Sequence, residues 1–202
     1  MTETGLESAN HGVQIYGGHG FIREWGMEQN VRDARISTLY EGTTGIQSLD
    51  LLGRKVLGSG GKLLALFAGE VLELCAQVAE EEALADYGTT LGDYLAEWEQ
   101  LTRTIGERAV VDANEVGAVS VDYLMYSGYV VSAFFWAKMA LTAQQKLAAG
   151  SDEELFYRSK LSTASFYFQK LLPRAKLHAA GIMSGADSLM ELSDDDFVSM
   201  AG

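Results

Sequence analysis

The sequence predicts an all-α protein in which a first group of helical segments is followed by an antiparallel helical bundle. A single proline occurs among 202 residues, and because proline breaks helices, its scarcity favours long ones. Apolar residues recur at helical spacing through several long segments, whereas no run of alternating apolar and polar residues indicates strands. Hydrophobic residues make up 48% of the chain, which is enough to bury a sizeable core.

The clearest break in the chain is the segment Gly-Ser-Gly-Gly at residues 58–61. Glycines spaced this closely weaken any helix and suit a linker. We therefore expect one domain at residues 1–57 and an additional helical domain at residues 62–202.

Residues before the break are expected to form helices separated by turns that contain glycine. The expected helices cover residues 4–16, 27–36 and about 44–57. The first helix is followed by a glycine turn at residues 17–20. Residues 40–45 interrupt the helical pattern, and Thr43 or Thr44 is expected to cap the third helix.

Residues after the break form four segments with apolar residues at helical spacing. The apolar positions are Leu63, Phe67, Val71, Leu74 and Val78; Leu91, Tyr94, Leu95, Trp98, Leu101 and Ile105; residues 123–147; and Tyr157, Leu161, Ala164, Phe168 and Leu171. Pro173 is expected to bend the fourth segment, because its ring clashes with the preceding turn of a helix. Ser193 is expected to cap a short last helix at residues 194–200, where acids in the first turn suit the helix dipole.

The composition argues against several classes of function. The formal net charge is −13, which opposes binding to nucleic-acid phosphates. Cys75 is the one cysteine, so the chain forms no internal disulfide or thiolate zinc cluster, and its histidines lie too far apart in the sequence to suggest a metal site. The N-terminus has no apolar core of the kind found in secretory signals, which favours a cytoplasmic protein.

One uncharged segment, at residues 123–137, is the nearest approach to a membrane span. It is shorter than the about 20 apolar residues that a span needs, and it contains Ser127, Gly128 and Ser132. We therefore predict a central buried helix and no membrane span.

Two motifs before the break contain residues that suit a binding or catalytic site. Gln-Ile-Tyr-Gly-Gly-His-Gly-Phe at residues 14–21 places glycines behind a helix, where backbone can approach a ligand closely. A helix C-cap and turn explain this motif about as well.

Tyr-Glu-Gly-Thr at residues 40–43 places Glu41 before a capped helix, where burial in a cleft would suit a general base. Taken alone, Glu41 is more readily explained as a solvated surface residue.

The two motifs in combination are much more specific than either alone. Residues 14–21 are followed by Val-Arg-Asp-Ala-Arg-Ile at residues 31–36 and by Tyr-Glu-Gly-Thr at residues 40–43. In order, spacing and residue type, this succession closely resembles the end of the acyl-CoA dehydrogenase family over residues 6–56.

The rest of the chain resembles the extra C-terminal helical domain of longer bacterial members, which include the 3-methylmercaptopropionyl-CoA dehydrogenase type. Phe-Tyr-Arg-Ser-Lys-Leu at residues 156–161 and Phe-Tyr-Phe-Gln-Lys-Leu-Leu-Pro at residues 166–173 carry this resemblance. The predicted fold is therefore part of the dehydrogenase C-terminal bundle followed by a second bundle.

The resemblance implies an FAD-dependent oxidation of an acyl-CoA to the trans-2-enoyl-CoA. By position, Glu41 corresponds to the base that removes the α-proton, and Gly42 to a substrate contact near the thioester. Residues that correspond to cofactor contacts are Thr43, Thr44 and Gly45 along the flavin, and Gln14, Gly17 and Gly18 at the adenosine diphosphate part of a neighbouring subunit's FAD. Family members often carry glutamine where this chain has Gly45, so a side-chain contact is missing there. The resemblance also implies a homo-oligomer and an electron-transfer flavoprotein as electron acceptor.

The resemblance further implies that the chain is a C-terminal portion. The family's N-terminal helical domain and its middle β-domain, which supplies much of the flavin and acyl-CoA site, have no counterpart in this sequence. We therefore expect the isolated chain to hold no FAD and to be inactive. Two alternatives stay open: a helical subunit-assembly module without chemistry of its own, and a fragment of an acyl-CoA oxidase, which uses a similar base but passes electrons to oxygen.

Overall fold

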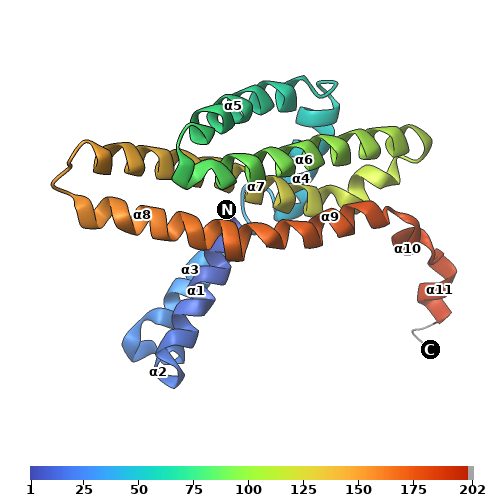
Figure 1. Cartoon of the computed structure of the whole chain (residues 1–202). Coiled ribbons are helices and arrows are strands. Elements are labelled where there is room, and N and C mark those ends of the chain that lie inside the picture. The colour runs from blue at the N-terminus through green and yellow to red at the C-terminus, as the bar shows by residue number, and fades with distance from the viewer. Residues whose placement is uncertain (200–202) are drawn as a thin grey trace. The chain divides into compact units, whose positions relative to one another are not determined.

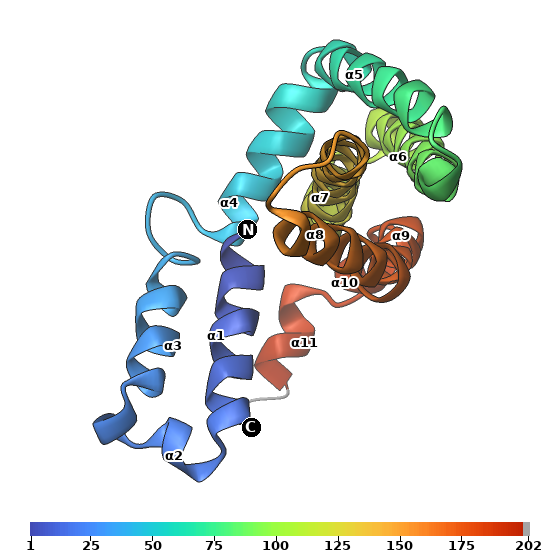
Figure 2. The ribbon, with the colours of Figure 1, turned by 60° about the vertical axis from the view of Figure 1, so that its left-hand side comes forward.

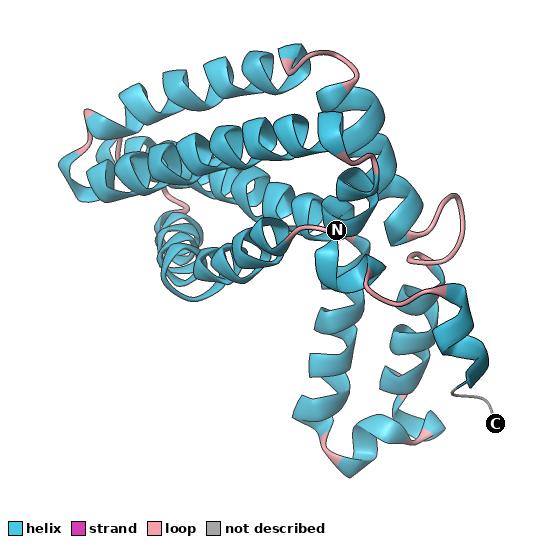
Figure 3. Ribbon diagram, turned by 90° about the vertical axis from the view of Figure 1, so that its right-hand side faces the viewer, coloured by secondary structure: helices cyan, strands magenta, loops and turns pink. Residues whose placement is uncertain are grey.

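The computed structural model describes residues 1–199, and every regular element in this range is a helix (Figure 3). The predicted all-α class is therefore confirmed. The chain divides into two compact units, Met1–Asp50 and Leu51–Gly202.

The first unit is a helical hairpin followed by a short helix. Its elements are α1 (Thr2–Tyr16), α2 (Gly18–Phe21), the 3-10 turn η1 (Arg23–Trp25), α3 (Met27–Ile36) and α4 (Thr44–Leu49). α1 and α3 pack side by side, and α2 lies at the tip of their hairpin (Figure 2). The predicted helices at residues 4–16 and 27–36 are confirmed. In place of the simple glycine turn, Gly17 adopts a left-handed φ of 59° and α2 adds a single helical turn.

The first unit buries no apolar side chain. Its buried residues are Gly20, Thr38 and Ser48, whereas Ile15 and Phe21 are 83% and 78% exposed. Most helical stability in proteins comes from packing an apolar face. Packing of the helices of this unit against one another therefore contributes little to their stability.

A π-helical segment, η2 (Asp50–Leu57), continues α4 directly. The Gly58 N–H donates to the Gly53 carbonyl, five residues back, at 2.8 Å, as the wider π pattern requires. Gly60 and Gly61 follow with φ of 63° and 78°, and these left-handed glycines end the helix where it was predicted to end.

The second unit is a bundle of long helices around α7 (Figure 1). Its elements are α5 (Lys62–Ala79), η3 (Glu82–Leu84), α6 (Ala85–Val111), α7 (Asn114–Ala148), α8 (Glu154–Phe166), η4 (Tyr167–Leu171), η5 (Leu172–Arg174), α9 (Ala175–Ser184), α10 (Asp187–Met190) and α11 (Asp194–Ser199). α7 packs against α5, α6, α8 and α9. Buried residues occur along α7 from Val119 to Ala143, although Val121 and Phe135 are 44% and 51% exposed. The predicted central helix is therefore confirmed, with one side of it open to solvent. Within residues 1–199, no helix combines the length and apolarity needed to cross a membrane.

The fourth predicted segment of this bundle does not run as one helix. α8 widens into the π-helical η4, and Pro173 then lies at the start of the tighter 3-10 turn η5, before α9 begins. Proline has no N–H and its ring clashes with the preceding turn, so a regular helix cannot continue through it. The predicted bend at Pro173 is confirmed.

The C-terminal end contains one helix that the sequence did not predict, α10, and one that it did, α11. The Ser193 N–H and hydroxyl both donate to the Asp196 carboxylate, at 2.8 and 2.7 Å, which resembles one half of a capping box. Met200, the predicted last residue of this helix, lies outside the described residues.

Buried tyrosines of α7 bring polar groups into the bundle. The Tyr123 hydroxyl donates to Thr102 Oγ1 at 2.8 Å, and Thr102 in turn donates to a carbonyl of its own helix at 2.8 Å. The Tyr126 hydroxyl donates to the Glu97 carboxylate at 2.6 Å, and the Lys176 ammonium binds the same carboxylate at 2.8 Å. Each of these buried hydroxyls therefore has the partner that an apolar interior requires.

The folded state should lose stability in strong base because of Tyr123. Burial raises the pKa of Tyr123 from its ordinary value of 10.0 to about 12. The unfolded chain therefore releases the phenolic proton first, so stability is complete below pH 10 and is lost as pH rises through about 12. We expect the unfolding free energy, measured by urea denaturation, to fall by up to about 3 kcal/mol for this residue.

Tyr123→Phe should remove this part of the pH dependence, whereas Tyr16→Phe, at an exposed position, should not. Burial also raises the pKa of Tyr167 to about 12, so some pH dependence should persist in Tyr123→Phe. A pH dependence that is identical in Tyr123→Phe and the unaltered chain would contradict the prediction.

Candidate active site

The candidate site is formed by residues 41–45, which comprise the end of the turn between α3 and α4 and the first two residues of α4. Glu41 has a φ of 53° and is the one residue other than glycine with a positive φ in the described part of the chain. Gly42 follows with a φ of 91°. A side chain with a Cβ disfavours this left-handed region by about 1–2 kcal/mol, and such conformations cluster at functional sites. The predicted base thus lies at the most unusual backbone position of residues 1–199.

The turn is fixed at its C-terminal end by the start of α4. The Ile46 N–H donates to Thr43 Oγ1 at 3.3 Å, so Thr43 is the N-cap of this helix. The Thr44 hydroxyl donates to the Glu3 carboxylate in the first turn of α1. Of the two predicted caps, Thr43 is therefore confirmed, and Thr44 instead connects α4 to α1.

A side chain of α4 also reaches back over the turn. Gln47 Nε2 donates to the Glu41 carbonyl oxygen at 2.9 Å. A Cβ added to Gly42 would lie 3.0 Å from the same Nε2 and 3.3 Å from Ile46 Cγ2. Glycine at position 42 therefore suits both the backbone conformation and the close contact with Gln47.

The Glu41 side chain is exposed, and residues 42–45 are exposed or half-buried. The sequence suggested that burial in a cleft would make Glu41 a base. The Met1–Asp50 unit does not supply that burial, so groups outside this unit would have to enclose the carboxylate.

The glycine motif lies at the other end of α1. Gln14, Gly17 and Gly18 are exposed, and a Cβ added to either glycine would meet no atom within 4 Å. Glu3, bound to Thr44, lies in the first turn of α1, whereas Gly17 follows its last turn. At about 1.5 Å per residue these two ends are about 21 Å apart. The structure thus places the predicted cofactor-contacting residues in two groups that do not touch (Figure 2).

Each of the two groups of residues could contact an extended nucleotide cofactor, but neither could enclose it. The open space beside Gly17 and Gly18 allows a group from outside the chain to approach the backbone. Neither group lines the groove between α1 and α3. These residues can therefore contact FAD from one side, while the rest of its site would come from other segments. Among residues 1–199, no group of three His, Cys, Asp or Glu side chains could hold a metal ion.

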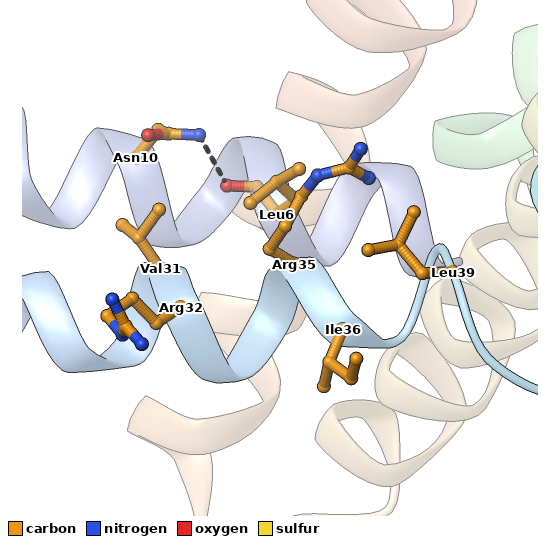
Figure 4. A pocket seen from close by; sticks show the side chains of 7 residues that line it. All are labelled: Leu6, Asn10, Val31, Arg32, Arg35, Ile36 and Leu39. Atoms are coloured by element: carbon orange, nitrogen blue, oxygen red, sulfur yellow. Dashed lines mark hydrogen bonds between the residues drawn. The ribbon is translucent and has the colours of Figure 1, made fainter.

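An open groove of about 510 Å³ runs between α1 and α3 (Figure 4). Its lining residues are Leu6, Asn10, Val31, Arg32, Arg35, Ile36 and Leu39. The Arg35 guanidinium donates to the Thr38 hydroxyl, and Asn10 Nδ2 donates to the Leu6 carbonyl at 3.1 Å. The groove was not predicted from the sequence, although the spacing of four residues between Val31, Arg35 and Leu39 indicated a shared face.

Fold and site together define an all-helical region that carries a conformationally strained glutamate before a capped helix. Residues 1–57 match the family model described as acyl-CoA dehydrogenase, C-terminal domain. Residues 67–193 match the model described as acetyl-CoA dehydrogenase C-terminal like. The chain belongs to the acyl-CoA dehydrogenase family.

Similar relatives include dehydrogenases from several bacteria. The 3-methylmercaptopropionyl-CoA dehydrogenase of Ruegeria pomeroyi is 37% identical over 197 residues, which cover 95% of this chain and 33% of the relative. The broad-specificity linear acyl-CoA dehydrogenase FadE5 of Mycobacterium tuberculosis is 29% identical, over 97% of this chain and 33% of the relative. The caffeyl-CoA reductase-Etf complex subunit CarC of Acetobacterium woodii is 46% identical over 20% of this chain and 11% of the relative. The chain spans about a third of the length of the first two relatives.

The cap at Thr43 should be measurable at a single amide. Thr43→Ala removes the acceptor of the Ile46 N–H, and loss of a threonine cap costs about 1 kcal/mol. We expect hydrogen exchange of the Ile46 amide, followed by NMR, to become about fivefold faster. Thr43→Ser keeps the hydroxyl and should leave the rate close to that of the unaltered chain. Equal rates in the alanine and serine variants would contradict the assigned cap.

Proposed function

We propose that the chain is the C-terminal part of an FAD-dependent acyl-CoA dehydrogenase, which oxidises an acyl-CoA to the trans-2-enoyl-CoA with Glu41 as the base. The observation that carries the proposal is the left-handed backbone of Glu41, with a φ of 53°. Strain of this kind persists where a site needs a side chain in one particular position. Membership of the family and the Tyr-Glu-Gly-Thr motif at residues 40–43 support the same assignment.

In this proposal, the Glu41 carboxylate takes a proton from the α-carbon of the acyl thioester, and a hydride leaves the β-carbon as the double bond forms. FAD, when bound, supplies the hydride acceptor. Gly42 contacts the substrate near the thioester, where hydrogen-bond donors to the carbonyl oxygen stabilise the developing enolate. Enclosure of Glu41 by the rest of the enzyme excludes water and strengthens the base.

The remaining predicted residues are assigned to the cofactor. Thr43, Thr44 and Gly45 lie along the flavin, and Gln14, Gly17 and Gly18 contact the adenosine diphosphate part, which belongs to a neighbouring subunit's FAD. The separation of the two groups by the length of α1 is consistent with contacts to distant parts of FAD, or to two FAD molecules in a homo-oligomer. We also propose an electron-transfer flavoprotein as electron acceptor, which the resemblance to the family supports.

We propose the two regions as domains with different roles. Residues 1–57 form part of the catalytic C-terminal helical domain, and residues 62–202 form an additional helical domain. A role in subunit assembly is the second candidate function, favoured by exposed apolar side chains such as Leu66, which is 71% exposed, and Leu177, which is 74% exposed. An oxidase of the same chemistry remains the third.

Glu41→Gln in a complete flavoenzyme that carries this chain tests the catalytic assignment. The amide keeps the size of the side chain but cannot accept a proton, and a general base contributes about 10²–10⁴-fold to rate. We expect turnover, measured by reduction of an artificial electron acceptor, to fall by at least about 10²-fold, with the flavin retained. Glu24→Gln, at another exposed glutamate, is the matched control. A Glu41→Gln enzyme with nearly full turnover would instead favour the assembly role.

The isolated chain of 202 residues should bind no flavin by itself. Its predicted cofactor contacts are open to solvent and far apart, so they cannot enclose FAD. The measurement is the visible absorbance of purified protein after incubation with FAD and gel filtration, together with assay of dehydrogenase activity. Stoichiometric flavin that co-elutes with the chain would contradict this prediction.

A further inference from the structure

We infer that Gln47 is a positioning residue that holds the Glu41 backbone in its left-handed conformation, an inference that rests on the proposed role of Glu41 as the base. Gln47 lies in α4, six residues after Glu41, and its Nε2 donates to the Glu41 carbonyl oxygen at 2.9 Å. Neither the family motif nor the helical pattern pointed to this residue.

Glu41 needs such a contact because its conformation is unfavourable by itself. A residue with a Cβ rarely has a φ near 53°. An unfavourable backbone conformation persists only where surrounding groups determine it. A hydrogen bond to the carbonyl of the strained residue fixes the orientation of the peptide that follows it, which is the peptide between Glu41 and Gly42.

Gln47 also contacts the second residue of the turn. A Cβ added to Gly42 would lie 3.0 Å from Gln47 Nε2, so the glutamine side chain lies directly over this glycine. One side chain therefore binds the first left-handed residue and occupies the space beside the second. A bulkier residue at position 42 would displace Gln47 and adopt the φ of 91° only with strain.

The donor itself comes from a well-fixed part of the unit. The Gln47 N–H bonds to the Thr43 carbonyl at 2.9 Å in the first turn of α4. Thr43 caps this helix, and Thr44 binds the Glu3 carboxylate on α1. The carbonyl of Glu41 is thus tied, through Gln47 and the capped helix, to the first turn of α1. Precise sites need this kind of support from regular elements behind the reactive group.

Gln47 acts through Glu41 and does not contact substrate. A base has to lie within about 2.6–3.2 Å of the atom whose proton it removes, and a misplacement of about 1 Å can cost about 10²-fold in rate. Loss of Gln47 should therefore lower kcat and leave KM and flavin content nearly unchanged.

The first test measures the backbone and requires no activity. Gln47→Met keeps the length of the side chain and removes the donor. In NMR spectra of the 202-residue chain, we expect the strong intraresidue amide–Hα cross-peak of Glu41, which is typical of positive φ, to weaken. Gln47→Lys, which restores an N–H donor of similar reach, should recover it, and Gln145→Met, at an exposed glutamine of α7, should not change it. An undiminished cross-peak in Gln47→Met overturns the inference.

The second test measures turnover in a complete flavoenzyme that carries this chain. We expect Gln47→Met to lower kcat about tenfold, which is about 1.4 kcal/mol, with KM unchanged. An unchanged kcat in Gln47→Met overturns the inference. A Glu41→Gln enzyme with unchanged turnover overturns instead the proposed function, while the NMR measurement still decides whether Gln47 holds the turn.

Discussion

Burial of most of α7 between four other helices is the constraint on which the second unit depends. A helix surrounded by others has to find partners for each polar group inside the bundle. These partners also define the position of each neighbouring helix along the axis of α7. Tyr123 binds Thr102 of α6, and Tyr167 of η4 donates to the Tyr129 carbonyl at 2.8 Å. On α9, His178 Nδ1 lies 2.8 Å from the Asp122 carboxylate. Apolar contacts alone would allow the helices to slide, whereas these hydrogen bonds define one register.

The first unit meets the opposite situation, because it has no apolar core that could hold a strained backbone. Its site has to be held by hydrogen bonds. The left-handed conformation of Glu41 costs about 1–2 kcal/mol, while a helix cap contributes about 1 kcal/mol and a single hydrogen bond about 0.5–1.5 kcal/mol. The cap at Thr43 and the Gln47 bond are together of the same size as the strain. The free energy of these two contacts therefore barely exceeds the strain of the turn, so loss of either contact should disturb the turn.

The sequence predicted those features that depend on local periodicity or on a single cap. The helix at residues 27–36, the bend at Pro173 and the cap at Thr43 all follow from rules that act over one or two helical turns. It did not predict the π-helical stretches, which are rare insertions within α-helices. It also missed Gln47, whose role becomes visible only when the turn brings a carbonyl six residues back within reach. The exposure of Glu41 shows the same limit, since burial depends on groups far away in sequence.

The length of α1 decides how the candidate residues can act together. A rigid helix separates the Glu41 turn from the Gly17 turn by about 21 Å, and a single acyl group cannot touch both. Only an extended ligand, or two ligands, can use both ends of this hairpin. The motifs at residues 14–21 and 40–43 thus form two contacts that are separate in space, and Gly17 and Glu41 are both exposed. The hairpin is accordingly suited to present one strained carboxylate and one glycine turn to a site whose enclosure other segments complete.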